Sequence, residues 1–427
     1  MAATLAPPSA TPDRSAMADA AAAAPAPPAG VAGRERLLSL DVFRGLTVAG
    51  MLLVNDPGSW AHIYPPLEHA RWHGWTPTDL IFPFFLFIVG ITTQLSLGAR
   101  RAAGAGDAAI LRQVARRGAL IFLFGLLLNW FPGFQWGDIK GLPDPSFGER
   151  VLYRLEHLRV MGVLQRIGLA YIVAGLVTLR TTVRQQVAMV AALLVGYWAL
   201  MALAAVPPTG RPGYQVWDQP GTTVDAWLDR VVLTPAHLWA GGGGLRDPEG
   251  LLGTLPAVAS VLVGHLAGRW IARRDLALAE RLNGLFAAGA LGMVAGLVWH
   301  WAFPINKSLW TSAYVVFTAG VAAVALATCV WVIDVRRVTG WTRPFVVYGT
   351  NPMLAFLGSG VMARILYSIV RVEVDGKRVP AVEAIYRVLA VPGVDPRLAS
   401  LAFALLFVGF WYLVLLACWK RGIVFRV

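Results

Sequence analysis

Residues 309–333 read LWTSAYVVFTAGVAAVALATCVWVI, and this stretch contains no aspartate, glutamate, lysine or arginine. An apolar run of about 20 residues is long enough to cross the hydrocarbon core of a bilayer as a helix. In that core a helix satisfies its backbone hydrogen bonds internally, which an open strand cannot do. The stretch therefore predicts a transmembrane helix.

Comparable apolar runs recur along the rest of the chain. Charged residues make up only 14% of the 427 residues, whereas soluble domains carry about 25%. We therefore predict an all-α fold, a polytopic membrane helix bundle of about ten transmembrane helices. The predicted spans are roughly 38–56, 78–98, 118–131, 160–179, 186–206, 251–268, 283–303, 309–333, 345–369 and 398–418.

The two ends of the chain differ in composition. Residues 1–33 are rich in alanine and proline and lack the pattern of a signal peptide, so we predict a disordered cytoplasmic tail. Residues 34–427 are predicted to form the transmembrane domain. Its third span is short and is expected to begin earlier, among residues 111–117.

Arginine and lysine are concentrated in alternate loops, which predicts the orientation of the spans. Because the number of spans is even, both termini are predicted to be cytoplasmic. The net charge of +13 is spread between spans rather than gathered in one stripe, so the predicted partner is the bilayer and not nucleic acid. The basic segments are residues 34–36, 100–117, 180–184, 269–281, 336–343 and 420–426.

Several polar residues lie inside the predicted spans, where charge is costly and usually faces the bundle interior. Asp41 and Arg44 are spaced i, i+3 in the first span, so they form either a structural ion pair or a site at which Arg44 meets an anionic ligand. Gln165 and Arg166 lie in the fourth span. Arg166 either pairs with an acid such as Asp41 or faces a phosphate-bearing ligand.

The segment before the second span is crowded with histidine. His62, His69 and His73 could include a general base or form a zinc site, although their spacing fits no compact zinc motif. Asp79 either caps the next helix or holds a histidine in one tautomer. Tryptophans such as Trp72 belong either to an interfacial aromatic belt or to a surface on which a sugar stacks.

Six stretches, in order along the chain, resemble the heparan-α-glucosaminide N-acetyltransferase family of transmembrane acetyltransferases. The resemblance predicts a bacterial member without the large lumenal N-terminal domain of the lysosomal enzyme. The stretches are residues 37–55 (LLSLDVFRGLTVAGMLLVN), 68–90 (EHARWHGWTPTDLIFPFFLFIVG), 162–171 (GVLQRIGLAY), 247–268 (DPEGLLGTLPAVASVLVGHLAG), 304–320 (PINKSLWTSAYVVFTAG) and 349–356 (GTNPMLAF).

The resemblance implies that acetyl passes from cytoplasmic acetyl-CoA to an amino sugar, or a related amine, on the far side, with no metal. It selects His69 as the active histidine, with Asp79 orienting it and Asn55 near the reacting carbonyl. Matching motif positions and intramembrane polarity predict the coenzyme-binding residues Asp41, Arg44, Gln165 and Arg166. The predicted acceptor-binding residues are Trp72, Asp247, Asn306 and Lys307.

The sequence alone leaves two other functions open. An inner-membrane transporter for N-acetylglucosamine or a related sugar is the main alternative, and a structural membrane subunit is a third. The predicted location is a bacterial inner membrane. The sequence does not separate direct transfer from an acetyl-histidine intermediate, and it leaves both a monomer and a homodimer open.

Overall fold

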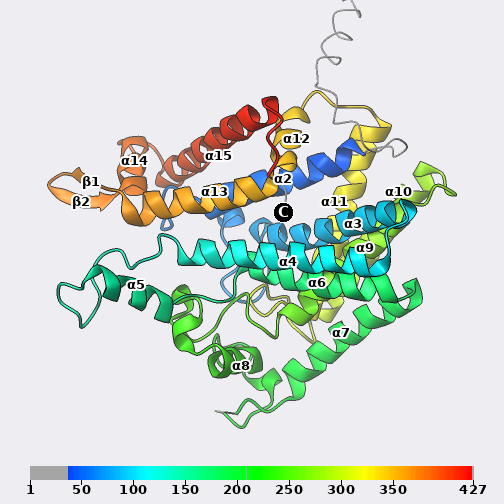
Figure 1. Cartoon of the computed structure of the whole chain (residues 1–427), viewed down its shortest axis with the longest axis horizontal. Coiled ribbons are helices and arrows are strands. Elements are labelled where there is room, and N and C mark those ends of the chain that lie inside the picture. Colours follow the sequence, from blue (N-terminus) through cyan, green and yellow to red (C-terminus); the bar gives the residue numbers. More distant parts are fainter. Residues whose placement is uncertain (1–36, 208, 426–427) are drawn as a thin grey trace, which may run out of the picture. The chain divides into compact units, whose positions relative to one another are not determined.

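The computed structural model describes residues 37–207 and 209–425, so the predicted tail, residues 1–33, lies outside the described residues. Within them the regular structure is predominantly helical, and the only sheet is an antiparallel hairpin of β1 (Arg371–Val374) and β2 (Lys377–Pro380). The predicted all-α membrane helix bundle is confirmed (Figure 1).

Every predicted span has a helix in the structure. These helices are α2 (Leu38–Asn55), α3 (Ile81–Ala102) preceded by the 3-10 turn η2 (Pro77–Leu80), α4 (Asp107–Trp130), α6 (Val163–Arg180), α7 (Val183–Leu203), α9 (Thr254–Ile271), α10 (Leu278–Trp299), α11 (Ser312–Val330) extended by η6 (Trp331–Val335), α12 (Arg343–Thr350) with α13 (Pro352–Arg364) and η7 (Ile365–Ile369), and α15 (Pro396–Lys420).

Among the described residues, eight of these helical segments are long and apolar enough to cross a membrane. The other two predicted spans correspond to α4 and α9. Arg112, Arg116 and Arg117 make the first half of α4 polar, and His265 and Arg269 lower the hydropathy of α9. The count of ten spans therefore stays a prediction.

Shorter elements fill the segments between the spans. In Figure 1, α5, α14 and the hairpin lie at the left of the view, near the left ends of α4, α13 and α15. These elements are α5 (Phe147–Glu156), α8 (Val224–Val232), α14 (Ala381–Leu389) and the 3-10 turns η1 (Pro65–Leu67), η3 (Gly213–Gln215), η4 (Pro235–His237) and η5 (Ala240–Gly242).

Glycines let the helices of the bundle approach one another closely. A Cβ at Gly90 of α3 would collide with the backbone of α9, and a Cβ at Gly264 of α9 would collide with the backbone of α3. Gly45 of α2 and Phe345 of α12 are in similarly close contact. Small residues at such crossings allow the van der Waals packing that holds membrane helices together.

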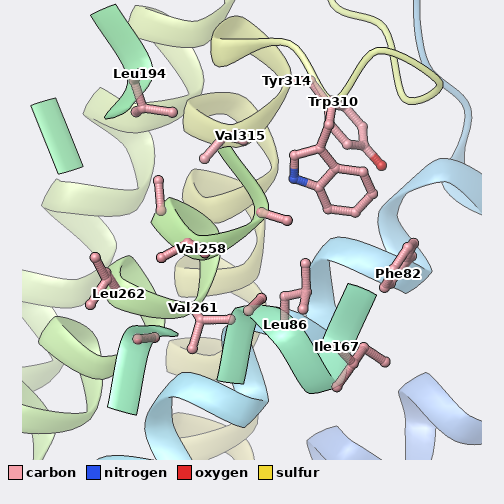
Figure 2. Close-up of a cluster of buried hydrophobic side chains, with 14 of the residues drawn as sticks. Phe82, Leu86, Ile167, Leu194, Val258, Val261, Leu262, Trp310, Tyr314 and Val315 are labelled. Atoms are coloured by element: carbon pink, nitrogen blue, oxygen red, sulfur yellow. The ribbon is translucent and has the colours of Figure 1, made fainter. Parts of the chain in front are cut away.

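Two apolar clusters form the core. The first joins α3, α6, α7, α9 and α11, and it includes Phe82, Leu86, Val261 and Trp310 (Figure 2). The second joins α2, α12, α13 and α15 around residues such as Trp411. Helices from both clusters line a large cavity, so packing on either side defines the walls of the candidate site.

The ninth predicted span is divided at Asn351. Helix α12 ends at Thr350 and α13 begins at Pro352. Because the chain turns there, the Asn351 side chain is available to hold the C-terminal segment: its Nδ2 donates to the Ile423 carbonyl and its Oδ1 accepts from the Phe425 N–H, both at 2.8 Å. Phe425 thereby reaches the large cavity.

Candidate active site

A cavity of about 610 Å³ extends through the bundle between α2, α3, α4, α6 and α13. Thr78 and Arg100 both line it, and the helical stretch between them is about 33 Å long at 1.5 Å per residue. That length is close to the thickness of a bilayer's hydrocarbon core, about 30 Å. Residues from both ends of the predicted transmembrane bundle therefore line one cavity.

The lining of this cavity changes along its length. Arg44, Arg100 and Arg117 lie at the end that the basic loops predict to be cytoplasmic. The middle is lined by apolar side chains such as Phe85, Ile88, Val89, Met353 and Phe356. The far end is again lined by polar side chains, namely Asn55, His69, Glu249 and Lys307.

His69 and Asp79 are in direct contact at the far end. The His69 Nδ1 lies 2.7 Å from the Asp79 Oδ1. The Asp79 Oδ2 accepts the backbone N–H groups of Ala70 and Thr76 at 3.0 Å, in a capping box at the start of η2. A carboxylate that accepts the Nδ1 proton leaves Nε2 unprotonated, so His69 Nε2 can act as a base or a nucleophile.

Lys307 reaches the same histidine from the hairpin between α10 and α11. Its Nζ lies 3.1 Å from His69 Nδ1 and 3.2 Å from Nε2, and 3.7 Å from Asp79 Oδ1. Burial lowers the pKa of Lys307, and the nearby carboxylates of Asp79 and Glu249 only partly offset that effect. The site therefore holds an amino group directly beside the imidazole, in surroundings that make its charged form less favourable than in water.

Of the three histidines before the second span, only His69 lines the cavity. His73 lies between Asp218 Oδ1, at 2.8 Å from its Nε2, and Asn306 Nδ2, at 3.3 Å from its Nδ1. His62 lies beside Ser59 and Tyr386. Within the described ranges, no three histidine, cysteine or acidic side chains are grouped as metal ligands would be.

Asn306 and Trp72, both predicted to bind the acceptor, do not line the cavity. The fully buried Asn306 accepts the Leu309 N–H at 2.9 Å, which shapes the hairpin that carries Lys307. The Trp72 Nε1 donates to the Trp217 carbonyl at 2.8 Å, and the Arg246 guanidinium lies 5.0 Å from the Trp72 ring centroid.

Asp247 and Glu249 belong to one buried network with Arg159. Arg159 donates to Asp247 through two bonds of 2.8 and 2.6 Å, and it also donates to Glu249. Burial alone would raise the pKa of Glu249, but Arg159 and Arg166 reverse this and lower it. Glu249 thus brings a carboxylate to the cavity, a role that its position in the sequence did not indicate.

The structure places the four residues predicted to bind coenzyme at two different locations. Arg44 lines the cavity and pairs with Asp41 at 2.7 Å, so these two lie at the arginine end. Gln165 and Arg166 do not line this cavity. Arg166 is fully buried, donates to the Gly250 carbonyl at 3.0 Å and lies 5.2 Å from the Trp310 ring centroid.

The buried carboxyl of Asp229, in α8, leads to a prediction about stability. Burial raises the pKa of Asp229 to about 7, and the neighbouring Asp225 and Asp247 reinforce the shift while the Leu251 N–H and Arg166 oppose it. An unfolded aspartate ionises near pH 3.9. Between these two pH values the carboxyl group is ionised in the unfolded state but protonated in the folded state. The free energy of unfolding therefore falls as the pH rises through this window.

Asp229→Asn is therefore expected to increase the free energy of unfolding by up to about 4 kcal/mol at about pH 8, and to have little effect at about pH 4.5. The amide oxygen can still accept the Leu251 N–H. Thermal unfolding in detergent at the two pH values measures the difference. An equal effect at both values would contradict the assignment.

The sequence also matches known proteins. A family model described as heparan-alpha-glucosaminide N-acetyltransferase, catalytic, matches residues 36–288, more than half of the chain. The chain belongs to this family. The heparan-alpha-glucosaminide N-acetyltransferase resemblance seen in the sequence motifs is thereby confirmed. The matched residues include Asn55, His69, Asp79 and Glu249, so most of the far end of the cavity lies within the family's catalytic region.

Two curated relatives carry the same family name. The heparan-alpha-glucosaminide N-acetyltransferase of Homo sapiens is 27% identical over 370 residues, which cover 76% of this chain and 53% of the relative. That of Mus musculus is 27% identical over 375 residues, which cover 77% of this chain and 54% of the relative. The chain spans about half the length of these relatives.

Proposed function

We propose that this chain is a transmembrane acetyltransferase in a bacterial inner membrane. It transfers acetyl from cytoplasmic acetyl-CoA to an amino sugar, or a related amine, on the opposite side, with both termini cytoplasmic. The observation that carries the proposal is the single cavity that joins three arginines at one end to the His69–Asp79 pair at the other.

The change from basic to apolar to polar side chains along the cavity matches the chemistry of acetyl-CoA. The nucleotide phosphates are anionic, and arginine guanidinium groups bind phosphate through strong, charge-assisted hydrogen bonds. Arg44, Arg100 and Arg117 supply such groups. The narrow pantetheine arm suits the apolar middle of the cavity, so its thioester would lie near His69 while the nucleotide stays at the cytoplasmic end.

The side chains around His69 can each serve one part of the transfer. His69 Nε2 takes a proton from the acceptor amine as its nitrogen bonds to the thioester carbonyl carbon. The carbon–sulfur bond then breaks, and the leaving thiolate takes the proton back. Asn55 and Lys307 are donors at the same end of the cavity, and they stabilise the negative oxygen of the intermediate.

An acetyl-histidine route uses the same residues in a different order. His69 Nε2 attacks the thioester first and the thiolate leaves. The acceptor amine then displaces the imidazole, and the proton that the amine loses passes through Nε2 to the thiolate. Asp79 supports either route because it fixes the proton on Nδ1.

Reconstitution separates the enzyme from the transporter. Proteoliposomes with labelled acetyl-CoA on the side of the basic loops and glucosamine on the other side are expected to yield N-acetylglucosamine on the glucosamine side. Uptake of N-acetylglucosamine without acetyl-CoA, combined with no acetylation of any amine, would instead establish the transporter.

Removal of a cavity arginine tests the proposed coenzyme site. Arg44→Ala and Arg117→Ala are each expected to weaken acetyl-CoA binding about 10- to 100-fold, the loss typical of a hydrogen bond to a charged group. Arg112→Ala is the matched control, because Arg112 is an exposed arginine of the same helix, α4, that does not line the cavity. Equal affinity in all three folded variants would remove these arginines from the coenzyme site.

A further inference from the structure

A second, smaller cavity of about 250 Å³ lies between α2, α4, α6 and α13. Asn55 lines both this cavity and the large one, as do Met51, Val163, Leu164 and Phe356. The second cavity is therefore next to the His69 end of the large cavity, on the side of the membrane that the proposed acceptor approaches.

The second cavity contains buried polar groups with no partner in the protein. Gln165 is 1% exposed and its Nε2 has no hydrogen-bond partner. Gly125 and Gly162 pack directly against the oxygen end of this amide, and a Cβ at either position would collide with it. A buried donor without a partner costs about 1–3 kcal/mol, which a ligand that accepts the hydrogen bond would recover.

Asp56, the residue after α2, is a second group of this kind. It is 5% exposed, it lines the second cavity, and it has no hydrogen bond or ion pair with the described side chains. Its carboxyl group is therefore available to accept hydrogen bonds from a molecule in the cavity.

Two more polar residues, Asn129 and Arg364, line the second cavity. Arg364 lines the cavity and donates from Nη1 to the Gly360 carbonyl of its own helix at 3.0 Å. Asn129 donates from Nδ2 to the Arg159 carbonyl at 3.0 Å, which fixes the position of its amide. Donors and acceptors thus surround one small space, whereas the middle of the large cavity is apolar.

The size and the lining indicate the class of ligand. Sites for drug-sized molecules measure about 300–1,000 Å³, so 250 Å³ suits a smaller molecule. A single sugar ring presents hydroxyl groups, each both donor and acceptor, in several directions at once. Such a ring can satisfy a carboxyl, a guanidinium and an amide together, which a purely apolar amine cannot do.

We propose that the second cavity binds the sugar ring of the acceptor, with Asp56, Gln165 and Arg364 contacting its hydroxyl groups and with its amine directed toward Asn55 and His69. This proposal rests on the acetyltransferase function proposed above. It places Gln165 in acceptor binding rather than coenzyme binding.

The test compares two acceptors that differ in their hydroxyl groups. Glucosamine carries them, and cyclohexylamine has a six-membered ring without them. Asp56→Asn, Gln165→Leu and Arg364→Met are each expected to raise the KM for glucosamine about 10-fold or more, the loss expected for one or two hydrogen bonds. The KM for cyclohexylamine and the affinity for acetyl-CoA are expected to change less than about twofold.

Glu383→Gln is the control. Glu383 lies in an exposed ion pair with Arg387 on α14 and lines neither cavity, so both KM values are expected to stay at the wild-type level. Circular dichroism and retained acetyl-CoA binding identify the folded variants. An unchanged glucosamine KM in folded variants, or an equal rise for glucosamine and cyclohexylamine, would overturn the assignment.

Direct binding separates this inference from the proposed function. If the wild-type protein acetylates no amine, equilibrium dialysis with labelled glucosamine on the purified full chain still tests the cavity. Glucosamine that binds the wild type and binds the three variants at least about 10-fold more weakly would support the subsite even though the enzyme proposal had failed. No glucosamine binding by the wild type would overturn the subsite.

Discussion

Replacement of His69 by alanine is expected to abolish acetyl transfer while acetyl-CoA still binds. The imidazole lies at the far end of the cavity, its Nδ1 2.7 Å from Asp79, and its side chain is 45% exposed, so the fold does not depend on it. Loss of a positioned general base typically costs about 10²–10⁴-fold in rate. Proteoliposomes loaded with labelled acetyl-CoA measure the transfer to glucosamine.

The other histidines of the same segment provide the controls. His62→Ala and His73→Ala are expected to retain most activity because neither side chain lines the cavity. Asp79→Asn is expected to fall between these cases, since it disturbs the tautomer of His69 without removing the ring. Substantial transfer by a folded His69→Ala protein would show that another group carries the chemistry.

Val89→Trp is expected to block acetyl transfer from the middle of the cavity. Val89 lies on α3 midway between Thr78 and Arg100, and all three line the cavity. An indole there would occupy the space proposed for the pantetheine arm and keep the thioester away from His69. Even a small displacement of a reacting group costs about 10²-fold, so we expect at least that loss, together with weaker acetyl-CoA binding.

The same substitution on the outer surface isolates the effect of the cavity. Val294 of α10 is 59% exposed and does not line the cavity, so Val294→Trp is expected to leave the rate unchanged. Thr92→Trp, one turn along the wall from Val89, should repeat the loss. Normal transfer in folded Val89→Trp and Thr92→Trp proteins would mean that acetyl-CoA does not pass through this cavity.

The sequence predicted helices well because a bilayer allows few alternatives. An apolar run of about 20 residues must satisfy its own backbone hydrogen bonds, so its structure follows from its composition. Each predicted run has a helix in the structure. The ends were less accurate: α4 begins at Asp107 rather than among residues 111–117 because polar residues extend its first turns.

Part of the site could also be predicted from the sequence. His69 and Asp79 are ten residues apart, in one motif, and their contact was expected from that motif. Lys307 was predicted to bind the acceptor, but nothing in the sequence indicated that its ammonium would lie beside His69. Glu249 was missed as a site residue, although it lies inside the quoted family stretch 247–268, two residues after Asp247.

What the sequence by itself determined is the set of apolar spans, the side on which the arginines gather, and the family motifs that single out His69. Only the tertiary structure decided which polar residues share a space. Arg166 and Arg44 both lie within apolar spans, but Arg166 is buried against Gly250 and Trp310, whereas Arg44 lines the large cavity. The physical reason is that hydropathy shows only that a polar side chain must turn inward. Its partner depends on how the helices cross, and at Gly45, Gly90 and Gly264 that is set by contacts between backbones far apart in the chain.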